Sequence, residues 1–225
     1  EAIIHAGAVN ETKVKVHSIH SEYLDENDVA EKLKGLDGVI VAPGFGERGI
    51  QGKIEAIRYV RENKIPFLGI CLGMQMAVIE HSRNVVGIKA ANSTEMEEHC
   101  SEPVISIMEE QKHIEDKGGT MRLGAWKCQL EKDSLAHNVY QSEAIEERHR
   151  HRYEFNDAYR ETIEKHGLKA TGINPETGLV EVVENPEHPW FIGVQYHPEY
   201  KSTVLDPHPL FVHFIQAALT NFNTK

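Results

Sequence analysis

Residues 66–75 read PFLGICLGMQ, and this stretch decides how the rest of the chain is interpreted. A short apolar run that ends at Ile70 is typical of a buried strand, and a helical pattern follows from Leu72 to about His81. Cys71 therefore lies where a strand turns into a helix. In a doubly wound α/β sheet, that junction belongs to the edge at which ligands bind.

The segment GICLG (69–73) has the form of a nucleophile elbow with sulfur in place of oxygen. Small residues two positions either side of Cys71 permit a strained turn. At a helix N-terminus, the helix dipole and nearby N–H groups favour the thiolate over the thiol, and the N–H of Leu72 would face a developing oxyanion. The pattern alone is also typical of a buried structural cysteine.

Strands and helices alternate outward from this stretch. Apolar residues alternate in 13–19 and cluster in 38–42, which predicts two strands with a helix at about 28–34 between them. A further helix is predicted from Ile54 to Asn63. This order predicts one α/β domain built on a mixed sheet. The second half predicts strands at 104–108, 121–130, 149–155, 168–172, 179–183 and 190–196, and a helix at 208–222.

A candidate base for the cysteine lies in the segment QYHPE (195–199), 126 residues after Cys71. In extended chain His197 and Glu199 point to the same side, so the carboxylate can orient the imidazole. Pro198 restrains the pair because its ring fixes φ. A lone His-Pro-Glu is most often a surface turn, but with the elbow it predicts a Cys-His-Glu triad.

Charge and cysteine content limit the classes of partner. The 225 residues carry 24 Lys and Arg against 35 Asp and Glu, a net charge of −11, which argues against nucleic acid or an anionic membrane as the main partner. Three cysteines make a disulfide framework improbable and favour a reducing compartment, so we expect a cytoplasmic protein. The closest histidine spacing, at 149 and 151, does not resemble a metal site, and no metal is predicted.

Five segments together resemble a known family. Two of them resemble the nucleophile and base segments of class I (triad) glutamine amidotransferases, and three resemble the glutaminase domain of CTP synthases within that class. They occur in the family's order and extend over nearly the whole chain. They are PFLGICLGMQ (66–75), VQYHPEY (194–200), RNVVGIKAANSTE (83–95), GGTMRLG (118–124) and ERHRHRYE (147–154).

The resemblance implies roles for individual residues. Cys71 would be the nucleophile, His197 the general base and acid, and Glu199 the residue that orients His197. The backbone of Gly44 and Leu72 would form the oxyanion hole. The positions implied for binding of L-glutamine are Gly44, Leu72, Gly73, Met74, Gln75, Glu95 and Arg152.

Two of these positions suit the charges of free glutamine. Its α-ammonium can pair with Glu95, and its α-carboxylate can be held by the guanidinium of Arg152. In the family, a loop near the glutaminase site is associated with activation by GTP as an allosteric effector. Thr120 and Arg122 are the candidates here for that response.

The resemblance also implies what lies outside these residues. The fold would be an open, mixed and mostly parallel sheet flanked by helices, whose first strand is missing, so residues 1–225 would be an N-terminally incomplete, C-terminal domain of a longer enzyme. No cofactor is expected in this domain. ATP, Mg²⁺ and UTP would bind a synthetase domain in cis. The full enzyme would be a homotetramer, and the isolated domain a monomer.

One departure from the family concerns the oxyanion loop. The family typically reads Pro-Gly-Gly-Phe-Gly there, whereas this chain has Ala42-Pro43-Gly44-Phe45-Gly46. Pro43 cannot adopt a positive φ and donates no N–H. We therefore expect a loop that is stiffer or slightly displaced.

Three alternative functions remain open from the sequence. The first is a different triad amidotransferase, and the second is a γ-glutamyl hydrolase. The segments GGTMRLG and ERHRHRYE argue against both, because they resemble CTP synthases in particular. A glutaminase-like module kept for regulation, without turnover, is the third, and the intact triad argues against it.

Overall fold

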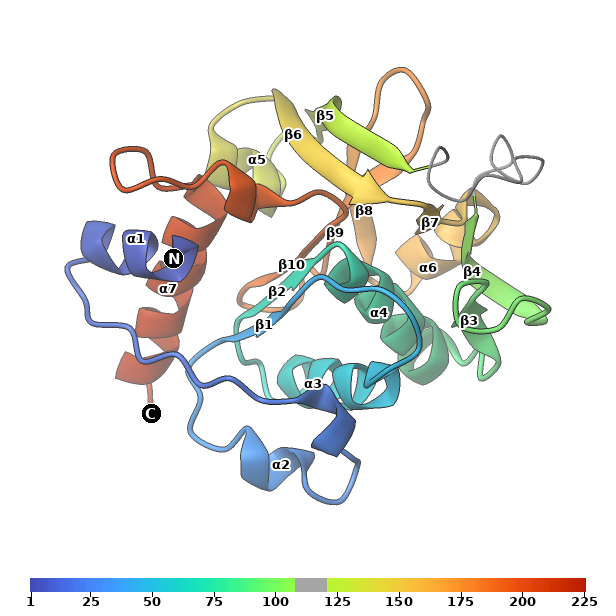
Figure 1. Cartoon of the computed structure of the whole chain (residues 1–225), viewed down its shortest axis with the longest axis horizontal. Coiled ribbons are helices and arrows are strands. Elements are labelled where there is room, and N and C mark those ends of the chain that lie inside the picture. Colours follow the sequence, from blue (N-terminus) through green and yellow to red (C-terminus); the bar gives the residue numbers. More distant parts are fainter. Residues whose placement is uncertain (108–120) are drawn as a thin grey trace.

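A seven-stranded sheet forms the centre of the computed structural model, which describes residues 1–107 and 121–225 (Figure 1). The spatial order is β1-β2-β10-β9-β8-β5-β6. The pairs β1–β2 and β2–β10 are parallel, and the other neighbouring pairs are antiparallel. The strands are β1 (Val39–Val41), β2 (Phe67–Ile70), β5 (Arg122–Leu130), β6 (Ala144–His151), β8 (Lys169–Ile173), β9 (Val180–Glu184) and β10 (Phe191–Val194).

The predicted α/β class with a mixed sheet is confirmed, but the large sheet is not mostly parallel: its parallel pairs lie only at the end that contains β1, β2 and β10. The reason is the length of the connections. Short loops join β8 to β9 and β9 to β10, and such loops can join only antiparallel neighbours. The helix α3 lies between β1 and β2, as a parallel crossover requires.

Seven α-helices surround the sheet in the described ranges. The longest, α7, begins with Pro209 at its first position, where the missing N–H costs nothing, and the side chain of His208 accepts the N–H of Leu210. The helices are α1 (Ala2–Val9), α2 (Val29–Lys32), α3 (Ile50–Glu62), α4 (Leu72–His81), α5 (Leu135–Tyr140), α6 (Arg160–Lys165) and α7 (Pro209–Asn223).

Hydrophobic cores cover both faces of the sheet. Along β2, Phe67 belongs to the core formed with α3 and α4, whereas Leu68 and Ile70 belong to the core formed with α1, α5 and α7. This alternation follows from the two-residue repeat of a strand. Every residue of α4 is buried, so the helix that follows Cys71 is enclosed along its whole length.

A smaller, three-stranded sheet lies beside the first and contains β3 (Ala91–Ser93), β4 (Glu102–Ile107) and β7 (Tyr153–Phe155). The single strand predicted at 149–155 is therefore two strands. β6 ends at His151 in the large sheet, and β7 begins at Tyr153 in the small one. Arg152 lies at the break, where the chain passes from one sheet to the other.

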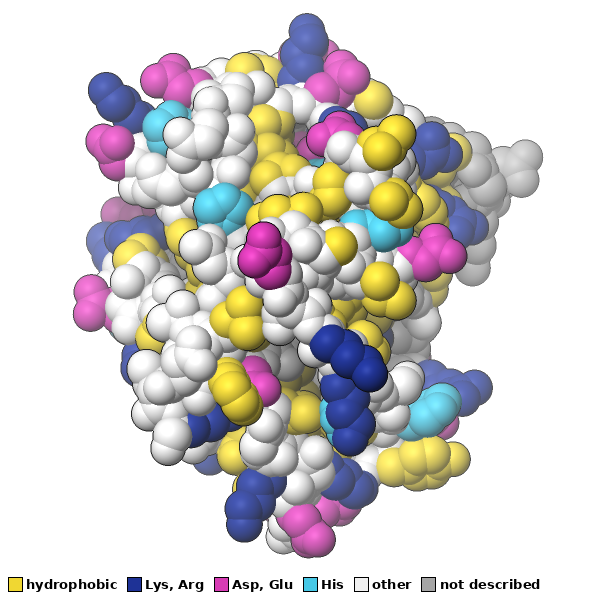
Figure 2. All heavy atoms as spheres, turned by 90° about the vertical axis from the view of Figure 1, so that its left-hand side faces the viewer, with side chains coloured by type: hydrophobic (Ala, Val, Ile, Leu, Met, Phe, Trp, Pro, Cys, Tyr) yellow, Lys and Arg dark blue, Asp and Glu magenta, His cyan; other side chains and the backbone are white. Residues whose placement is uncertain are grey.

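The strand predicted at 13–19 is wrong. These residues are in no strand and, within the described ranges, form no backbone hydrogen bonds. A groove of about 670 Å³ separates them from β1, the edge strand of the large sheet. Val14, Ile40 and Phe214 are among its lining residues. Figure 2 views the side of the molecule that carries α1 and α7, where hydrophobic side chains are visible between polar ones.

No helix in the described part of the chain is long and apolar enough to cross a membrane.

Candidate active site

Cys71 occupies the turn between β2 and α4. Its φ of 52° and ψ of −104° are rare for an L-residue, which is the strain expected of a nucleophile elbow. A Cβ on Gly73 would lie 2.1 Å from the carbonyl oxygen of Val41, and a Cβ on Gly69 would lie 2.8 Å from the backbone of Gly73. The two glycines therefore let α4 begin directly against β1 and β2.

Burial controls the ionisation of Cys71, which is 2% exposed. Burial raises the pKa of the thiol to about 12, and the backbone N–H of Leu72 lowers it. The negative charges of Glu154, Glu199 and Glu95 raise this pKa further. The N–H at the helix N-terminus favours the thiolate, as expected, but lost hydration outweighs this effect and the net pKa is raised. The thiolate has to form by proton transfer to a neighbouring base.

His197 and Glu199 form the predicted pair, by a different geometry. The residues Pro198–Tyr200 form a turn of 3₁₀-helix instead of the expected extended chain. This turn brings the Glu199 carboxylate to 2.7 Å from Nδ1 of His197. The backbone N–H of His197 also donates to the carbonyl of Arg148 on β6, at 2.8 Å.

The carboxylate fixes which ring nitrogen of His197 is available for chemistry. Because an ionised carboxylate can only accept, Nδ1 carries the proton and Nε2 is left with a free electron pair. Nε2 is buried and has no hydrogen-bond partner among the described residues. The ring is therefore oriented and ready to accept a proton.

The oxyanion loop lies against the start of α4. A Cβ on Gly44 would lie 3.3 Å from Cδ2 of Leu72 and 3.4 Å from Nζ of Lys53. The N–H of Gly46 donates to Oε1 of Glu95 at 2.9 Å. With Pro43 in place, the loop thus keeps Gly44 beside Leu72, the two residues predicted to supply N–H groups to an oxyanion.

Two of the predicted glutamine-binding side chains point into the interior. Met74 is fully buried in the hydrophobic core. The side-chain amide of Gln75 donates to the carbonyl of Tyr153 at 2.9 Å and to Oε1 of Gln195 at 3.2 Å. At both positions, the backbone is the part that a ligand can contact.

Glu95 and Arg152 are half-buried and lie near the same side chain, Tyr153. Burial raises the pKa of the Tyr153 hydroxyl, the charge of Glu95 raises it further, and the charge of Arg152 lowers it. A negative and a positive group therefore act on one tyrosine beside the nucleophile helix. This arrangement suits a small zwitterion.

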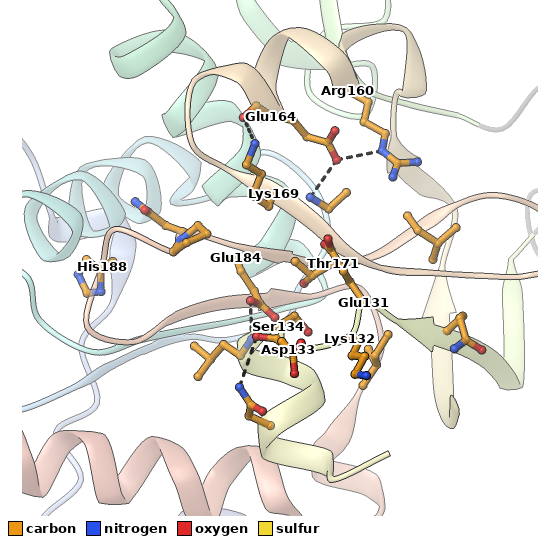
Figure 3. Close-up of a pocket in the computed structure, with 18 of the residues that line it drawn as sticks. Glu131, Lys132, Asp133, Ser134, Arg160, Glu164, Lys169, Thr171, Glu184 and His188 are labelled. Atoms are coloured by element: carbon orange, nitrogen blue, oxygen red, sulfur yellow. Dashed lines mark hydrogen bonds and ion pairs between the residues drawn. The ribbon is translucent and has the colours of Figure 1, made fainter. Parts of the chain in front are cut away.

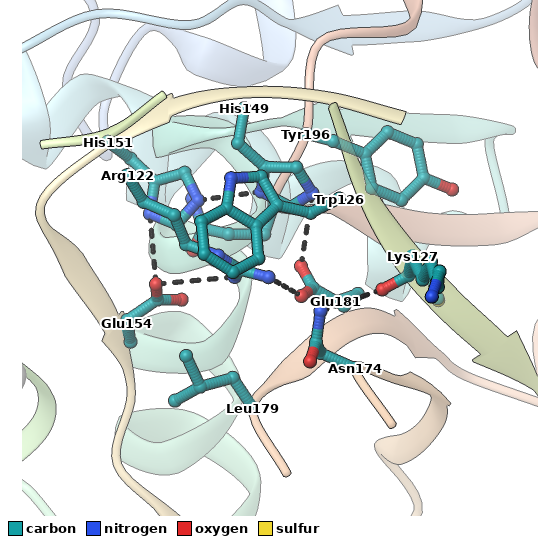
Figure 4. A network of polar contacts seen from close by, with 12 residues as sticks. Arg122, Trp126, Lys127, His149, His151, Glu154, Asn174, Leu179, Glu181 and Tyr196 are labelled. Atoms are coloured by element: carbon teal, nitrogen blue, oxygen red, sulfur yellow. Dashed lines mark hydrogen bonds and ion pairs between the residues drawn. The ribbon is translucent and has the colours of Figure 1, made fainter. Parts of the chain in front are cut away.

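Five buried ionisable side chains form a ring (Figure 4), and two of them interact electrostatically with the site: Glu154 with Cys71 and His149 with His197. Arg122 binds Glu181 at 2.5 Å and Glu154 at 3.5 Å. His149 lies 3.5 Å from Glu181, and His151 lies 3.3 Å from Glu154. Nδ1 of His149 is 2.8 Å from Nε2 of His151, which closes the ring. All five residues are at most 4% exposed.

This buried ring contains Arg122, one of the two residues that the sequence predicts to respond to an effector. Arg122 is 4% exposed and its guanidinium is held by two carboxylates, so in this conformation it presents no charge to a ligand in solvent. Thr120 lies outside the described residues. In the structure the Arg122 guanidinium forms internal ion pairs with Glu154 and Glu181.

The sequence did not reveal the inward face of β6. Alternation along a strand puts Arg148 and Arg150 on the same face, and both are exposed. His149 and His151 alternate with them and were the available signal of a buried polar cluster. Gln195, Glu154 and Glu181 gave no signal of their own.

A further cavity of about 890 Å³ lies elsewhere (Figure 3). It is lined by residues near α5, α6 and the ends of β8 and β9, and several of its polar groups bind one another. Glu184 accepts the backbone N–H groups of Leu135 and Ala136 at 2.9 and 2.7 Å, and Glu164 lies 3.1 Å from Arg160. None of the predicted site residues lines it.

Among the described residues, no group of three His, Cys, Asp or Glu side chains is arranged so that it could hold a metal ion.

Comparison with known proteins defines the class. The sequence model of the glutamine amidotransferase class-I family matches residues 1–217. This match includes the elbow at Cys71, the pair formed by His197 and Glu199, and every position predicted to bind glutamine. The chain therefore belongs to the class I glutamine amidotransferase family.

Within that family, the likeness is to CTP synthases. The CTP synthase of Flavobacterium psychrophilum is 70% identical over 99% of this chain and 42% of that protein, and the one of Bacteroides thetaiotaomicron is 57% identical over 98% and 41%. The glutaminase domain of Trypanosoma brucei CTPS with bound acivicin superposes with a TM-score of 0.91 at 39% identity, over 97% of this chain and 86% of that one. These likenesses place the chain with the glutaminase domains of CTP synthases.

Proposed function

We propose that this chain hydrolyses L-glutamine to glutamate and ammonia, with Cys71 as the nucleophile and His197 as the general base and acid. The observation that carries the proposal is a cysteine held at a strained strand-to-helix turn, in a fold that also holds an imidazole oriented by a carboxylate 2.7 Å away. The membership of the glutamine amidotransferase family supports the same substrate.

The first half of the reaction forms a thioester. Nε2 of His197 accepts the thiol proton, and the Cys71 sulfur attacks the γ-amide carbon of glutamine. The N–H groups of Gly44 and Leu72 stabilise the oxyanion of the tetrahedral intermediate. His197 then returns its proton to the departing nitrogen, so ammonia leaves and a glutamyl thioester remains.

The second half releases glutamate. Neutral His197 takes a proton from water, and the resulting hydroxide attacks the thioester carbon. The same two N–H groups hold the second oxyanion, and the Cys71 thiolate leaves and recovers a proton from His197. Glu199 keeps the imidazole in one tautomer through both halves and stabilises the imidazolium that forms transiently.

Glutamate release from L-glutamine by the purified chain tests this proposal, together with labelling of Cys71 by a glutamine-mimicking electrophile. Turnover with label on Cys71 is the expected result. A folded protein that shows neither turnover nor label would contradict the proposal.

Replacing Arg152 with methionine should raise KM for glutamine about 10- to 100-fold and leave kcat within about tenfold. A hydrogen-bonded ion pair to the α-carboxylate exists in both the ground and transition states, so its loss weakens binding more than chemistry. Initial rates over a range of glutamine concentrations separate the two constants. The control is Arg58→Met, an exposed arginine on α3, which should leave both constants unchanged. An unchanged KM in the Arg152 variant would remove this residue from the substrate site.

We also propose that the ammonia serves a synthetase domain in cis. The chain spans about 42% of the length of the CTP synthase from F. psychrophilum. In such an arrangement ATP, Mg²⁺ and UTP bind the synthetase domain, UTP is aminated to CTP, and GTP is a candidate effector. The three cysteines are all free, which agrees with a reducing, cytoplasmic location.

We propose that a further strand occupies the groove beside β1. This strand would be supplied by the polypeptide that adjoins Glu1 in the longer protein. An edge strand and residues 13–19 face each other across the groove without hydrogen bonds between them. A protein extended at this end should melt about 5 °C higher or more, since a few kcal/mol of added stability produces such a shift. Amides of residues 13–19 should also gain protection from hydrogen exchange. Equal melting temperatures and unprotected amides would contradict the proposal.

A further inference from the structure

Gln195 contacts the nucleophile directly. It follows β10, is 0% exposed, and its backbone N–H donates to the carbonyl of Glu181 at 2.9 Å. Its side-chain nitrogen Nε2 donates to Sγ of Cys71 at 3.7 Å, which is within hydrogen-bond range for sulfur. A fully buried amide whose N–H is directed at the reacting atom calls for an explanation beyond packing.

Neighbouring groups fix the orientation of this amide. A backbone carbonyl can only accept, so the amide group of Gln75 that lies 2.9 Å from the Tyr153 carbonyl has to be its nitrogen. The same nitrogen lies 3.2 Å from Gln195, and the Gln195 atom that faces it has to be the oxygen. The nitrogen of Gln195 is thereby left facing Cys71. No other assignment of the two amides satisfies these contacts.

The surroundings of Cys71 explain why a hydrogen-bond donor is useful there. Cys71 is 2% exposed, and three carboxylates, Glu154, Glu199 and Glu95, act against a negative charge on its sulfur. The backbone N–H of Leu72 is one group that favours the thiolate, and it is also needed for the oxyanion. A second, independent donor would stabilise the thiolate without competing for that role.

We propose that Gln195 is a further catalytic residue, which donates a side-chain N–H to the Cys71 thiolate, and that Gln75 is a positioning residue which holds the Gln195 amide in the donating orientation. The proposal deepens the proposed function, since it rests on Cys71 as the nucleophile. The role proposed here concerns the side chain of Gln75, and the contact of its backbone with glutamine stays a prediction.

Alkylation of Cys71 by iodoacetamide, followed by mass spectrometry across a pH range, tests the proposal without glutamine. The thiolate is the reacting form, so the rate reports how easily the proton is lost. In Gln195→Met, which is similar in size and has no donor, the apparent pKa of Cys71 should rise by about one unit and the rate near pH 7.5 should fall about tenfold. Gln75→Met should shift the profile in the same direction by less, because the freed Gln195 amide can rotate.

Two comparisons separate this role from mere packing. Gln216→Met, an exposed glutamine on α7, should leave the pH profile unchanged. A folded Gln195→Met with an unchanged profile would show that the amide only fills space, and would overturn the proposal. Because alkylation needs no turnover, that result is distinct from a failure of the glutaminase assay.

A second measurement covers the case in which Gln195→Met does not fold. In the unsubstituted chain, the side-chain amide NMR signals of Gln195 should shift with the same apparent pKa as Cys71 alkylation. Amide signals that do not change over the pH range in which Cys71 ionises would contradict the proposal.

Discussion

Replacing Cys71 with alanine should abolish glutamate release, with a loss on the order of 10⁴-fold or more. Without the sulfur no thioester forms, and the remaining oxyanion donors and substrate contacts accelerate direct attack by water only weakly. The small change in volume at this buried turn leaves the fold in place. Glutamate release, measured at saturating glutamine, checks the loss, and labelling by a glutamine-mimicking electrophile should disappear with it.

Cys128→Ala is the matched control for this substitution. Cys128 is also a buried thiol, 1% exposed, and burial raises its pKa above the usual range, but it lies within strand β5 rather than at an elbow. Its replacement should leave turnover within about twofold. If the Cys71 variant kept a substantial fraction of its turnover, or if the Cys128 variant lost it, the nucleophile would have to be reassigned.

The parts of the site that sequence predicted correctly are those with a strong local signal. The glycines around Cys71 are spaced as an elbow requires, and a Cβ at Gly73 would collide with the Val41 carbonyl. The sequence placed His197 and Glu199 together for the wrong geometric reason, since a 3₁₀ turn and not an extended strand brings them into contact. The motif in the sequence identified the two residues, but only the folded structure showed how they contact each other.

What the sequence could not predict depends on contacts between distant segments. Alternation in 13–19 predicted a strand, but a strand also needs a partner, and the groove separates these residues from β1. Gln75 and Gln195 are 120 residues apart, and only the folded chain shows that they hydrogen-bond to each other. Likewise, nothing in the sequence around Arg122 indicates that Glu154 and Glu181 approach it.

The buried ring around Arg122 has an uneven balance of charge. One guanidinium faces two carboxylates, Glu181 and Glu154, and burial raises the pKa of both, that of Glu181 to about 7. Burial also lowers the pKa of His149 to about 2 and that of His151 to about 3, so both imidazoles are neutral at physiological pH. Arg122 is thus the cation on which the ionised state of the ring depends.

Arg122→Met should therefore destabilise the fold by about 3 to 5 kcal/mol at pH 8, because it leaves buried carboxylates without a counter-charge. The loss should shrink towards pH 5. An acid whose pKa is raised by folding is stabilised in its protonated form, and in the unsubstituted protein the protonated carboxylates no longer pair with the arginine. Denaturant unfolding of both proteins at each pH measures the difference.

Lys127→Met is the control on the same strand, since its ion pair with Glu176 is more than half exposed and should contribute less than about 1 kcal/mol. A difference for Arg122→Met no larger than that of the control would mean that the ring contributes little to stability.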